Sequence, residues 1–259
     1  MTKCLCLASL VFAVGCVDPP EQETGDTEQA VTGTALQTFP CDGSHGECVF
    51  PLGPTANRAC MLAGIRGDAS ADQLPTVVYI DTDGNADYQL VIENVYGGPT
   101  ILVTTVCVSA VTVGATSLWS SGDPPVRLTG PSSSARCFLS GWGDNNRADS
   151  RYADSVKAYQ DGAGAWWLGG SSTEMFGEAT CFHGAADDGA WSWGQTSGLN
   201  TGNLQYNGAG GVACALTELG GVFRANSQSD GVWLDFDSTY NVWTWTFSGA
   251  KHAAAECFR

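Results

Sequence analysis

The densest set of side chains able to do chemistry lies between Asp81 and Asp87. Oxygen-bearing side chains stand at alternate positions there, around a glycine at position 84; they are Asp81, Asp83, Asn85 and Asp87. Hard oxygen ligands at this spacing can converge on Ca²⁺. The same residue types also favour an ordinary tight turn that holds no metal. The sequence predicts a Ca²⁺-binding turn here, with a plain turn as the alternative, and it indicates no other cofactor.

The order Asp-x-Asp-Gly-Asn-x-Asp in this run resembles the calcium loops of FG-GAP and dockerin-type repeats, which implies that the same oxygens bind the ion. The run departs from those loops, because it lacks their second glycine and a bidentate glutamate at its far end. Elsewhere in the chain only fragments of the pattern occur, at Asp161-Gly162 and at Asp235-Phe236-Asp237.

Tryptophan is the second informative residue type, with nine copies in the chain. Three copies alternate with other residues as in buried strands: Trp233, Trp243 and Trp245. Four others stand in segments rich in Gly, Ser and Asp, which predicts loops: Trp119, Trp142, Trp191 and Trp193. An indole on a loop can stack on the apolar face of a sugar while short polar side chains bind its hydroxyls. Packing at the edges of the core is the alternative.

Candidate catalytic groups are scarce. None of the three histidines lies in a metal-binding or nucleophile motif, and no Gly-x-Ser-x-Gly is present. Neighbouring acids, as at Asp187-Asp188 or at Asp235 and Asp237, could serve a glycoside hydrolase, which uses two carboxylates. In a chain with 27 acidic and 11 basic residues, however, such pairs are common on solvated surface. The sequence therefore favours a protein that is not an enzyme.

Composition limits the partners. A net charge of −16 excludes nucleic acid and anionic membrane surfaces as main partners, because binding phosphate needs clustered Lys and Arg. A hydrophobic content of 43% excludes wholesale disorder. Only 15% of the residues are charged, so the polar surface rests on Gly, Ser, Thr, Asn and Gln, as is typical of extracellular β proteins.

The cysteines reveal the elements that must position these residues. Cys60, Cys137 and Cys214 lie 77 residues apart, and a second cysteine follows each of them by 47, 44 or 43 residues. The flanking residues repeat as well, with Cys-Met-Leu, Cys-Phe-Leu and Cys-Ala-Leu at the three opening cysteines. The sequence therefore predicts three tandem units.

This repeat selects one disulfide pairing. It joins Cys60–Cys107, Cys137–Cys181 and Cys214–Cys257, with a local Cys41–Cys48 bond ahead of the first pair. In the chain-entropy model each long loop contributes about 4 kcal/mol to stability. A zinc site is disfavoured, because the chain has no Cys-x-x-Cys.

Hydrophobic residues within each unit alternate with a period of two. In the third unit, Val232, Leu234 and Phe236 alternate with Trp233, Asp235 and Asp237 and are followed by a turn and a second alternating run. This period predicts an all-β fold of three disulfide-linked antiparallel units of about 77 residues. The cysteine segments are expected to be outer strands, so that each disulfide ties the two ends of one small sheet. Because one unit alone is marginally stable, packing around a pseudo-threefold axis is favoured over a string of separate domains.

The N-terminus has the features of an export signal over residues 1–15. Lys3 precedes an apolar run of 11 residues, which is too short to span a bilayer as a helix. The ending Ala13-Val14-Gly15-Cys16 resembles the lipobox of bacterial lipoproteins, which implies lipid attachment at Cys16; ordinary cleavage is the alternative. An acidic, Pro-bearing stretch predicts a flexible tether over 16–35, and the β units then occupy 36–112, 113–188 and 189–259.

The lipobox-like cysteine, the tether and the paired-cysteine units together resemble repeat lipoproteins that some Gram-negative bacteria export. The resemblance implies a location at the cell envelope or outside the cell, and no particular activity. The sequence predicts an exported, lipid-anchored binding protein at the outer membrane or cell surface, or secreted, that touches the membrane only through its lipid. Its predicted ligand is carbohydrate or another envelope surface. The alternatives are a structural or interaction protein, with its tryptophans buried between units, and a glycoside-type hydrolase.

Overall fold

The computed structural model describes most of the chain after residue 28, namely residues 29–31, 34–42, 46–67, 76–94, 100–109, 111–132, 134–144, 154–171, 175–183, 187–195, 199–206, 211–221, 231–249 and 251–259. The predicted signal peptide, Cys16 and the tether up to residue 28 lie outside the described residues. Within them every regular element is a β-strand, which confirms the all-β fold class.

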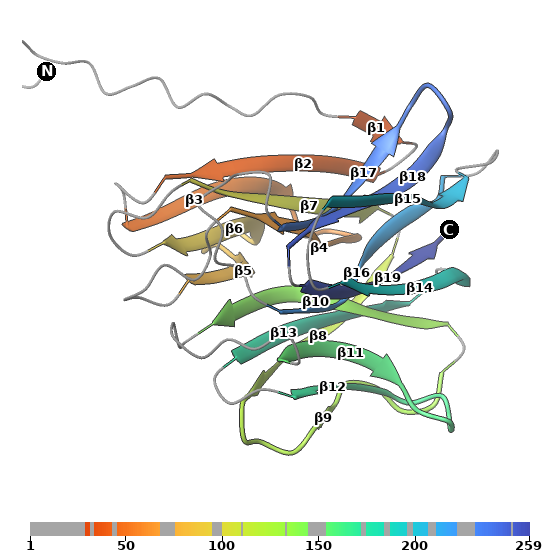
Figure 1. Cartoon of the computed structure of the whole chain (residues 1–259). Helices are drawn as coiled ribbons and strands as arrows, with labels where there is room; N and C mark the ends of the chain where they lie inside the picture. Colours follow the sequence, from red (N-terminus) through yellow and green to blue (C-terminus); the bar gives the residue numbers. More distant parts are fainter. Residues whose placement is uncertain are drawn as a thin grey trace, which may run out of the picture.

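In the part of the chain that the structure describes, nineteen strands form three antiparallel sheets, each of which combines strands from two units (Figure 1). The first sheet joins the first and third units in the order β1 (Gln29–Val31), β2 (Thr34–Cys41), β7 (Ile101–Ser109), β4 (Arg58–Arg66), β17 (Gly231–Asp237), β18 (Val242–Ser248) and β15 (Leu199–Tyr206).

The second sheet joins the first and second units in the order β3 (Gly46–Pro54), β6 (Asp87–Asn94), β5 (Thr76–Thr82), β10 (Ala135–Asp144), β13 (Met175–His183) and β8 (Thr112–Ser120). The third sheet joins the third and second units in the order β14 (Asp187–Gln195), β19 (Lys251–Phe258), β16 (Ala213–Gly221), β11 (Ser155–Gln160), β12 (Trp166–Ser171) and β9 (Val126–Arg127).

A seam, as we call it, runs through each sheet where two units meet. There the strand with the opening cysteine pairs with the first hairpin strand of the neighbouring unit: β4 with β17, β10 with β5, and β16 with β11. The registers are equivalent, because the residue four positions after each cysteine lies opposite the neighbour; the pairs are Gly64–Trp233, Gly141–Tyr79 and Glu218–Lys157. A β-bulge precedes this position in all three units. The three units therefore correspond residue by residue.

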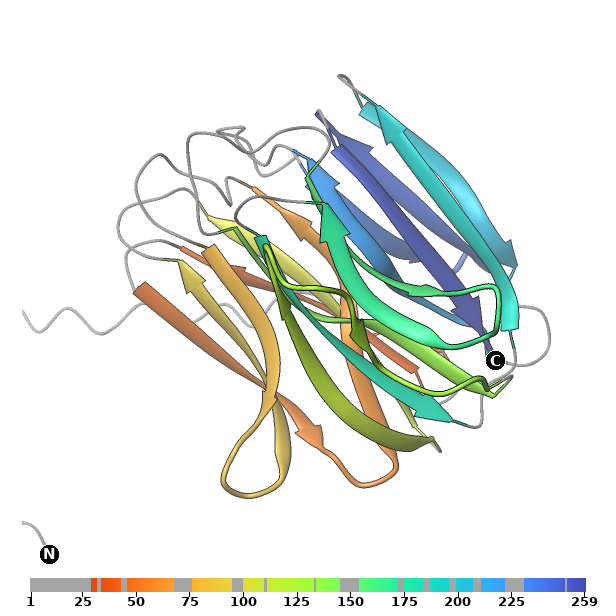
Figure 2. The ribbon, with the colours of Figure 1, turned by 90° about the horizontal axis from the view of Figure 1, so that it is seen from below.

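The three opening strands, β4, β10 and β16, also contact one another, so the units share one core. Phe138, Phe182 and Phe258, each of which follows a cysteine, pack there with ring centroids 4.9–5.6 Å apart. Figure 2 shows the strands of the three units in succession from red through green to blue. This packing confirms the pseudo-threefold arrangement.

The four disulfides are those that the repeat predicts: Cys41–Cys48, Cys60–Cys107, Cys137–Cys181 and Cys214–Cys257. The prediction that each long disulfide ties the two ends of a separate small sheet is wrong. Its cysteines lie directly opposite each other on adjacent strands, with Cα atoms 4.0 Å apart, in the interior of a sheet. Alternation along one strand does not reveal which unit supplies the neighbouring strand. The pairing between strands of different units could therefore not be predicted from the sequence.

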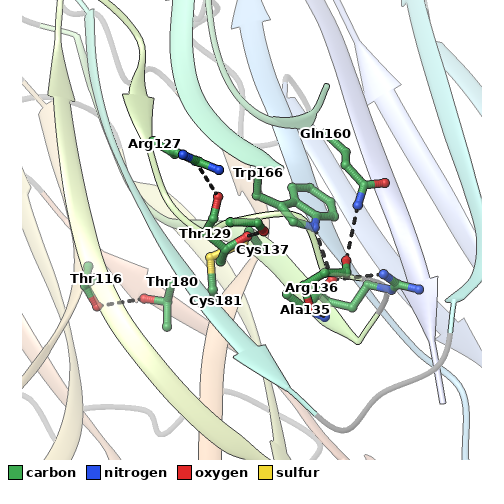
Figure 3. The surroundings of a disulfide bond; sticks show 12 residues. Thr116, Arg127, Thr129, Ala135, Arg136, Cys137, Gln160, Trp166, Thr180 and Cys181 are labelled. Atoms are coloured by element: carbon green, nitrogen blue, oxygen red, sulfur yellow. Dashed lines mark hydrogen bonds between the residues drawn. A yellow bond between two sulfur atoms is a disulfide. The ribbon is translucent and has the colours of Figure 1, made fainter. Parts of the chain in front are cut away.

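Buried tryptophans fix each hairpin to its own cysteine strand in the second and third units. The indole N–H of Trp166 donates to the carbonyl of Ala135 at 3.1 Å, beside the Cys137–Cys181 disulfide (Figure 3). Trp243 is its equivalent in the third unit and donates to the carbonyl of Val212 at 2.8 Å.

The predicted tether is too long at its C-terminal end. Residues 29–31 form β1, which pairs with β2, and β2 already begins at Thr34. Pairing along the edge of the first sheet satisfies backbone groups that a flexible tether would leave to water.

Candidate functional site

The four predicted sugar-binding tryptophans lie on strands, so the prediction of loops is wrong. Trp142 on β10 is fully buried, and Trp119 on β8 is 3% exposed and donates its indole N–H to the carbonyl of Asp123. A glycine on β12 makes room for one of these rings, because a Cβ on Gly170 would lie 2.9 Å from the ring of Trp119. Neither Trp119 nor Trp142 offers a ring face to a ligand.

Trp191 and Trp193 on β14 are partly exposed to solvent. Both lie opposite buried alanines of β19 and pack against the core. The indole of Trp193 stacks on that of Trp245, with centroids 5.0 Å apart and an angle of 19° between the ring planes. Most of their contact is therefore with other side chains of the third unit.

The predicted calcium run forms the turn between β5 and β6. One carboxylate oxygen of Asp83 accepts the backbone N–H groups of Asn85 and Asp87 at 2.8 and 2.9 Å, and the other accepts the side-chain amide of Asn85 at 3.2 Å. These bonds, that to Asp87 first, hold the pKa of Asp83 below its ordinary value. Asp81 accepts the N–H of Thr82 at 2.7 Å.

An aspartate caps the equivalent turn in all three units, with the same pair of bonds in the first two and a different second bond in the third. Asp161 accepts the backbone N–H groups of residues 163 and 165, both at 2.9 Å, and Asp237 accepts those of residues 239 and 240. A turn-forming role thus accounts for Asp83 and its two equivalents. Among the described residues no group of three or more His, Cys, Asp or Glu is placed to hold a metal ion. Calcium binding by Asp81, Asp83, Asn85 and Asp87 stays a prediction.

The outer face of the third sheet carries a pair of rings that we call the aromatic platform, Tyr159 on β11 and Trp167 on β12. The two residues lie directly opposite each other, and both are partly exposed. Asp161 orients the indole, because its second carboxylate oxygen accepts the Trp167 N–H at 2.8 Å. The Arg127 guanidinium lies 5.9 Å from the Trp167 ring centre, and the Lys157 ammonium lies 5.4 Å from that of Tyr159.

A polar cluster continues from the platform across the seam of the same sheet. We define it as Ser155, Lys157, Glu218 and His252, which surround Gly220. His252 Nδ1 lies 3.1 Å from a Glu218 carboxylate oxygen, and Ser155 also hydrogen-bonds to Glu218. A Cβ on Gly220 would lie 2.7 Å from the imidazole ring, so glycine is what allows His252 to lie across β16.

Charge at the cluster is balanced locally. Burial alone would raise the pKa of Glu218, but its bond to His252 and the charges of His252 and Lys157 lower it below the ordinary value. A nucleophilic triad needs the imidazole between the hydroxyl and the carboxylate. Here the carboxylate lies between Ser155 and His252, so the cluster does not have the order of a nucleophilic triad.

Equivalent positions in the other seams carry different side chains. Glu218 corresponds to Gly64 and Gly141, and His252 to Leu102 and Phe176. The fold therefore tolerates glycine and apolar residues at these positions, and the charged cluster belongs to the third sheet alone.

Sequence reasoning named Tyr159 and Trp167 only as parts of a weak strand pattern. The sequence predicts the turn at Asp161, and this turn places the two rings opposite each other. The polar cluster could not be predicted, because it forms only where the second and third units meet. The predicted acid pair Asp235 and Asp237 lies on β17, where each carboxylate accepts a backbone N–H of its own segment. The side chains of Asp187 and Asp188 lie outside the described residues.

Comparison of the chain with models of protein families found no match, and comparison with curated proteins found no relative. Within the stretches that the structure describes, no helix has the length and apolar character needed to cross a membrane. The four disulfides are compatible with an exported or extracellular protein.

Proposed function

We propose that the protein is an exported, non-enzymatic carbohydrate-binding protein and that the third sheet is its binding face. The observation that carries the proposal is the aromatic platform, where Trp167 and Tyr159 are adjacent and partly exposed and Asp161 holds the indole of Trp167. Aromatic rings with one accessible face bind the apolar face of a pyranose.

The polar cluster supplies the second half of such a site. A sugar on the platform lies next to Lys157, and beyond it to Glu218 and His252 across the seam. Hydrogen bonds between charged side chains and neutral hydroxyls are stronger than bonds between two neutral groups. Because Asp161 already fixes the indole, little side-chain freedom remains to be lost on binding.

The proposed place of action is the cell envelope. In this proposal Cys16 carries a lipid, and the acidic stretch after it lets the β domain reach glycans at the outer membrane or cell surface. Sec-type cleavage without a lipid would give the same domain as a secreted lectin.

The test is a glycan array followed by calorimetry on the hit, with the mature chain and two variants. Trp167→Ala should weaken binding about tenfold, the value of one good ring contact. Tyr240→Ala is the matched control, because Tyr240 is an aromatic residue that is 72% exposed on a turn of the third unit. Loss of affinity in both variants, or in neither, would contradict the placement of the site.

The burial of Trp119 and Trp142 favours a second candidate, a structural or interaction protein of the envelope without a small ligand. Absence of any array signal, with Trp167 fluorescence unaffected by glycans, would support that candidate. Release of reducing sugar from an array hit would instead support the hydrolase alternative.

A further inference from the structure

The seam of the first sheet contains a second, chemically different site. Arg66 on β4 lies opposite Gly231, and Trp233 on β17 lies opposite Gly64. Each large side chain thus faces a glycine of the other strand, and the Arg66 guanidinium carbon lies 4.7 Å from the centre of the Trp233 ring. A Cβ on Gly64 would lie 2.5 Å from that of Trp233, so this close approach requires glycine.

The guanidinium of Arg66 is partly exposed and lies near the charge of Asp235. It makes no hydrogen bond or ion pair with the residues that the structure describes, and its Nε is inaccessible to solvent and unpaired. Arginine presents five N–H donors in a planar fork that suits carboxylate or phosphate, and buried polar groups are nearly always hydrogen-bonded. Among the described residues Nε of Arg66 therefore has no acceptor, and a carboxylate or phosphate would suit the fork.

The fold does not require a cation at this position. Arg66 corresponds to Gly143 in the second seam and to Gly220 in the third. Burial lowers the pKa of Arg66, whereas the charge of Asp235 raises it. A cation that the fold can do without, and that costs desolvation, is expected where it serves binding.

Hydroxyl groups surround the pair along the same row of the sheet. Thr38 lies beyond Thr104 on one side of the row, and Thr246 lies opposite Trp233 on the other side; both are partly exposed. Thr104 itself is 2% exposed, and its hydroxyl lies 3.0 Å from that of Thr38. A ligand with one anionic group among several hydroxyls complements this face. Nucleic acid does not, because its regularly spaced phosphates would meet a chain of net charge −16.

We propose that Arg66 binds the carboxylate of an acidic sugar, of the uronic acid class, on the first sheet. The Trp233 ring packs against the guanidinium, and the hydroxyls of Thr38 and Thr246 face the hydroxyl groups of the sugar. This site is separate from the platform on the third sheet and does not depend on it.

The experiment is isothermal titration calorimetry of the mature chain with oligogalacturonate and with the same oligomer as its methyl ester. The acid should bind the unaltered protein, and the ester should bind at least about tenfold more weakly, because it offers no charged acceptor. Arg66→Gln should weaken binding of the acid about tenfold to a hundredfold. Asp235→Asn should strengthen it, because the neighbouring negative charge is removed.

The matched control is Arg58→Gln, the same charge change at the other end of β4. It should leave the affinity for the acid unchanged. Equal affinity for acid and ester, or no binding of the acid, would overturn the proposal without reference to any variant. Loss of acid binding in Trp167→Ala but not in Arg66→Gln would also overturn it, while leaving the platform on the third sheet in place.

Discussion

Replacing Gly64 by alanine should open the seam between the first and third units. The new Cβ would lie 2.5 Å from the Cβ and 2.6 Å from the Cα of Trp233, and 2.8 Å from the carbonyl oxygen of Val232. Carbon atoms in contact prefer about 3.5–4.0 Å, so β4 and β17 would have to separate by about 1 Å. Two of the three contacted atoms belong to the backbone, and no change of side-chain rotamer can move them.

The expected cost follows from these contacts. Overpacking of this kind costs about 1–3 kcal/mol, and the contact between the arginine and the indole adds about 0.5–1 kcal/mol. Alanine also lowers the conformational entropy of the unfolded chain, which offsets about 0.4–1 kcal/mol of this loss. A net loss of about 1–3 kcal/mol lowers the melting temperature of a domain of this size by about 2–12 °C.

Thermal unfolding followed by circular dichroism, with urea titration as a second measurement, tests this expectation against two graded controls. At Gly141, the equivalent position of the second seam, the nearest atoms are Cβ atoms at 3.1 Å, so Gly141→Ala should cost less. At Gly84 nothing lies within 4 Å, so Gly84→Ala should be neutral or slightly stabilising. If all three variants unfold alike, β4 and β17 do not pair in this register, and the proposed site at Arg66 fails with it.

Three further outcomes are expected. Because the pKa of Glu218 is lowered in the folded protein, its stabilising effect is present above about pH 4.5 and is lost as the pH falls through the lowered value. Glu218→Gln should therefore flatten the pH dependence of urea midpoints below pH 4.5; an unaltered profile would contradict the role of its ion pair. Replacing Cys137 and Cys181 together by serine should lower the free energy of unfolding by about 4 kcal/mol, measured by urea titration. Calorimetry with Ca²⁺ should show a binding heat that Asp83→Asn removes and Asp237→Asn retains; identical heats in both variants would refute the calcium turn.

The repeat was the most predictable feature, because three cysteine spacings and their flanking residues depend on the chain alone. Disulfide pairing followed from it and is confirmed. The strand exchange between units did not follow. Val232 and Val156 alternate in the same way whether their strands pair within a unit or across a seam, and only the three-dimensional register distinguishes these cases.

The candidate sites were less predictable for a related reason. Trp119 and Trp142 stand among glycines and serines, which suggested loops, but glycine also permits close packing of a ring against a neighbouring strand. Trp233 is partly exposed because it shares the outer face of β17 with Asp235 and Asp237, whereas Val232 and Leu234 face the core. Its neighbour on that face, Arg66, comes from another unit, so the sequence of the third unit alone does not reveal the contact.

The repeat itself provides a comparison that single sequences normally lack. Where equivalent positions of two units share one character, as with the buried indoles of Trp166 and Trp243, the common factor is packing. Where one unit alone has a charged residue, packing is not the reason. Arg66 replaces glycine at its seam, and Lys251 is fully buried where the other units have Ile101 and Met175. Since a charge within a sheet costs desolvation, and two of the three units form the same seam with glycine in place of Arg66, the seam itself does not require that arginine.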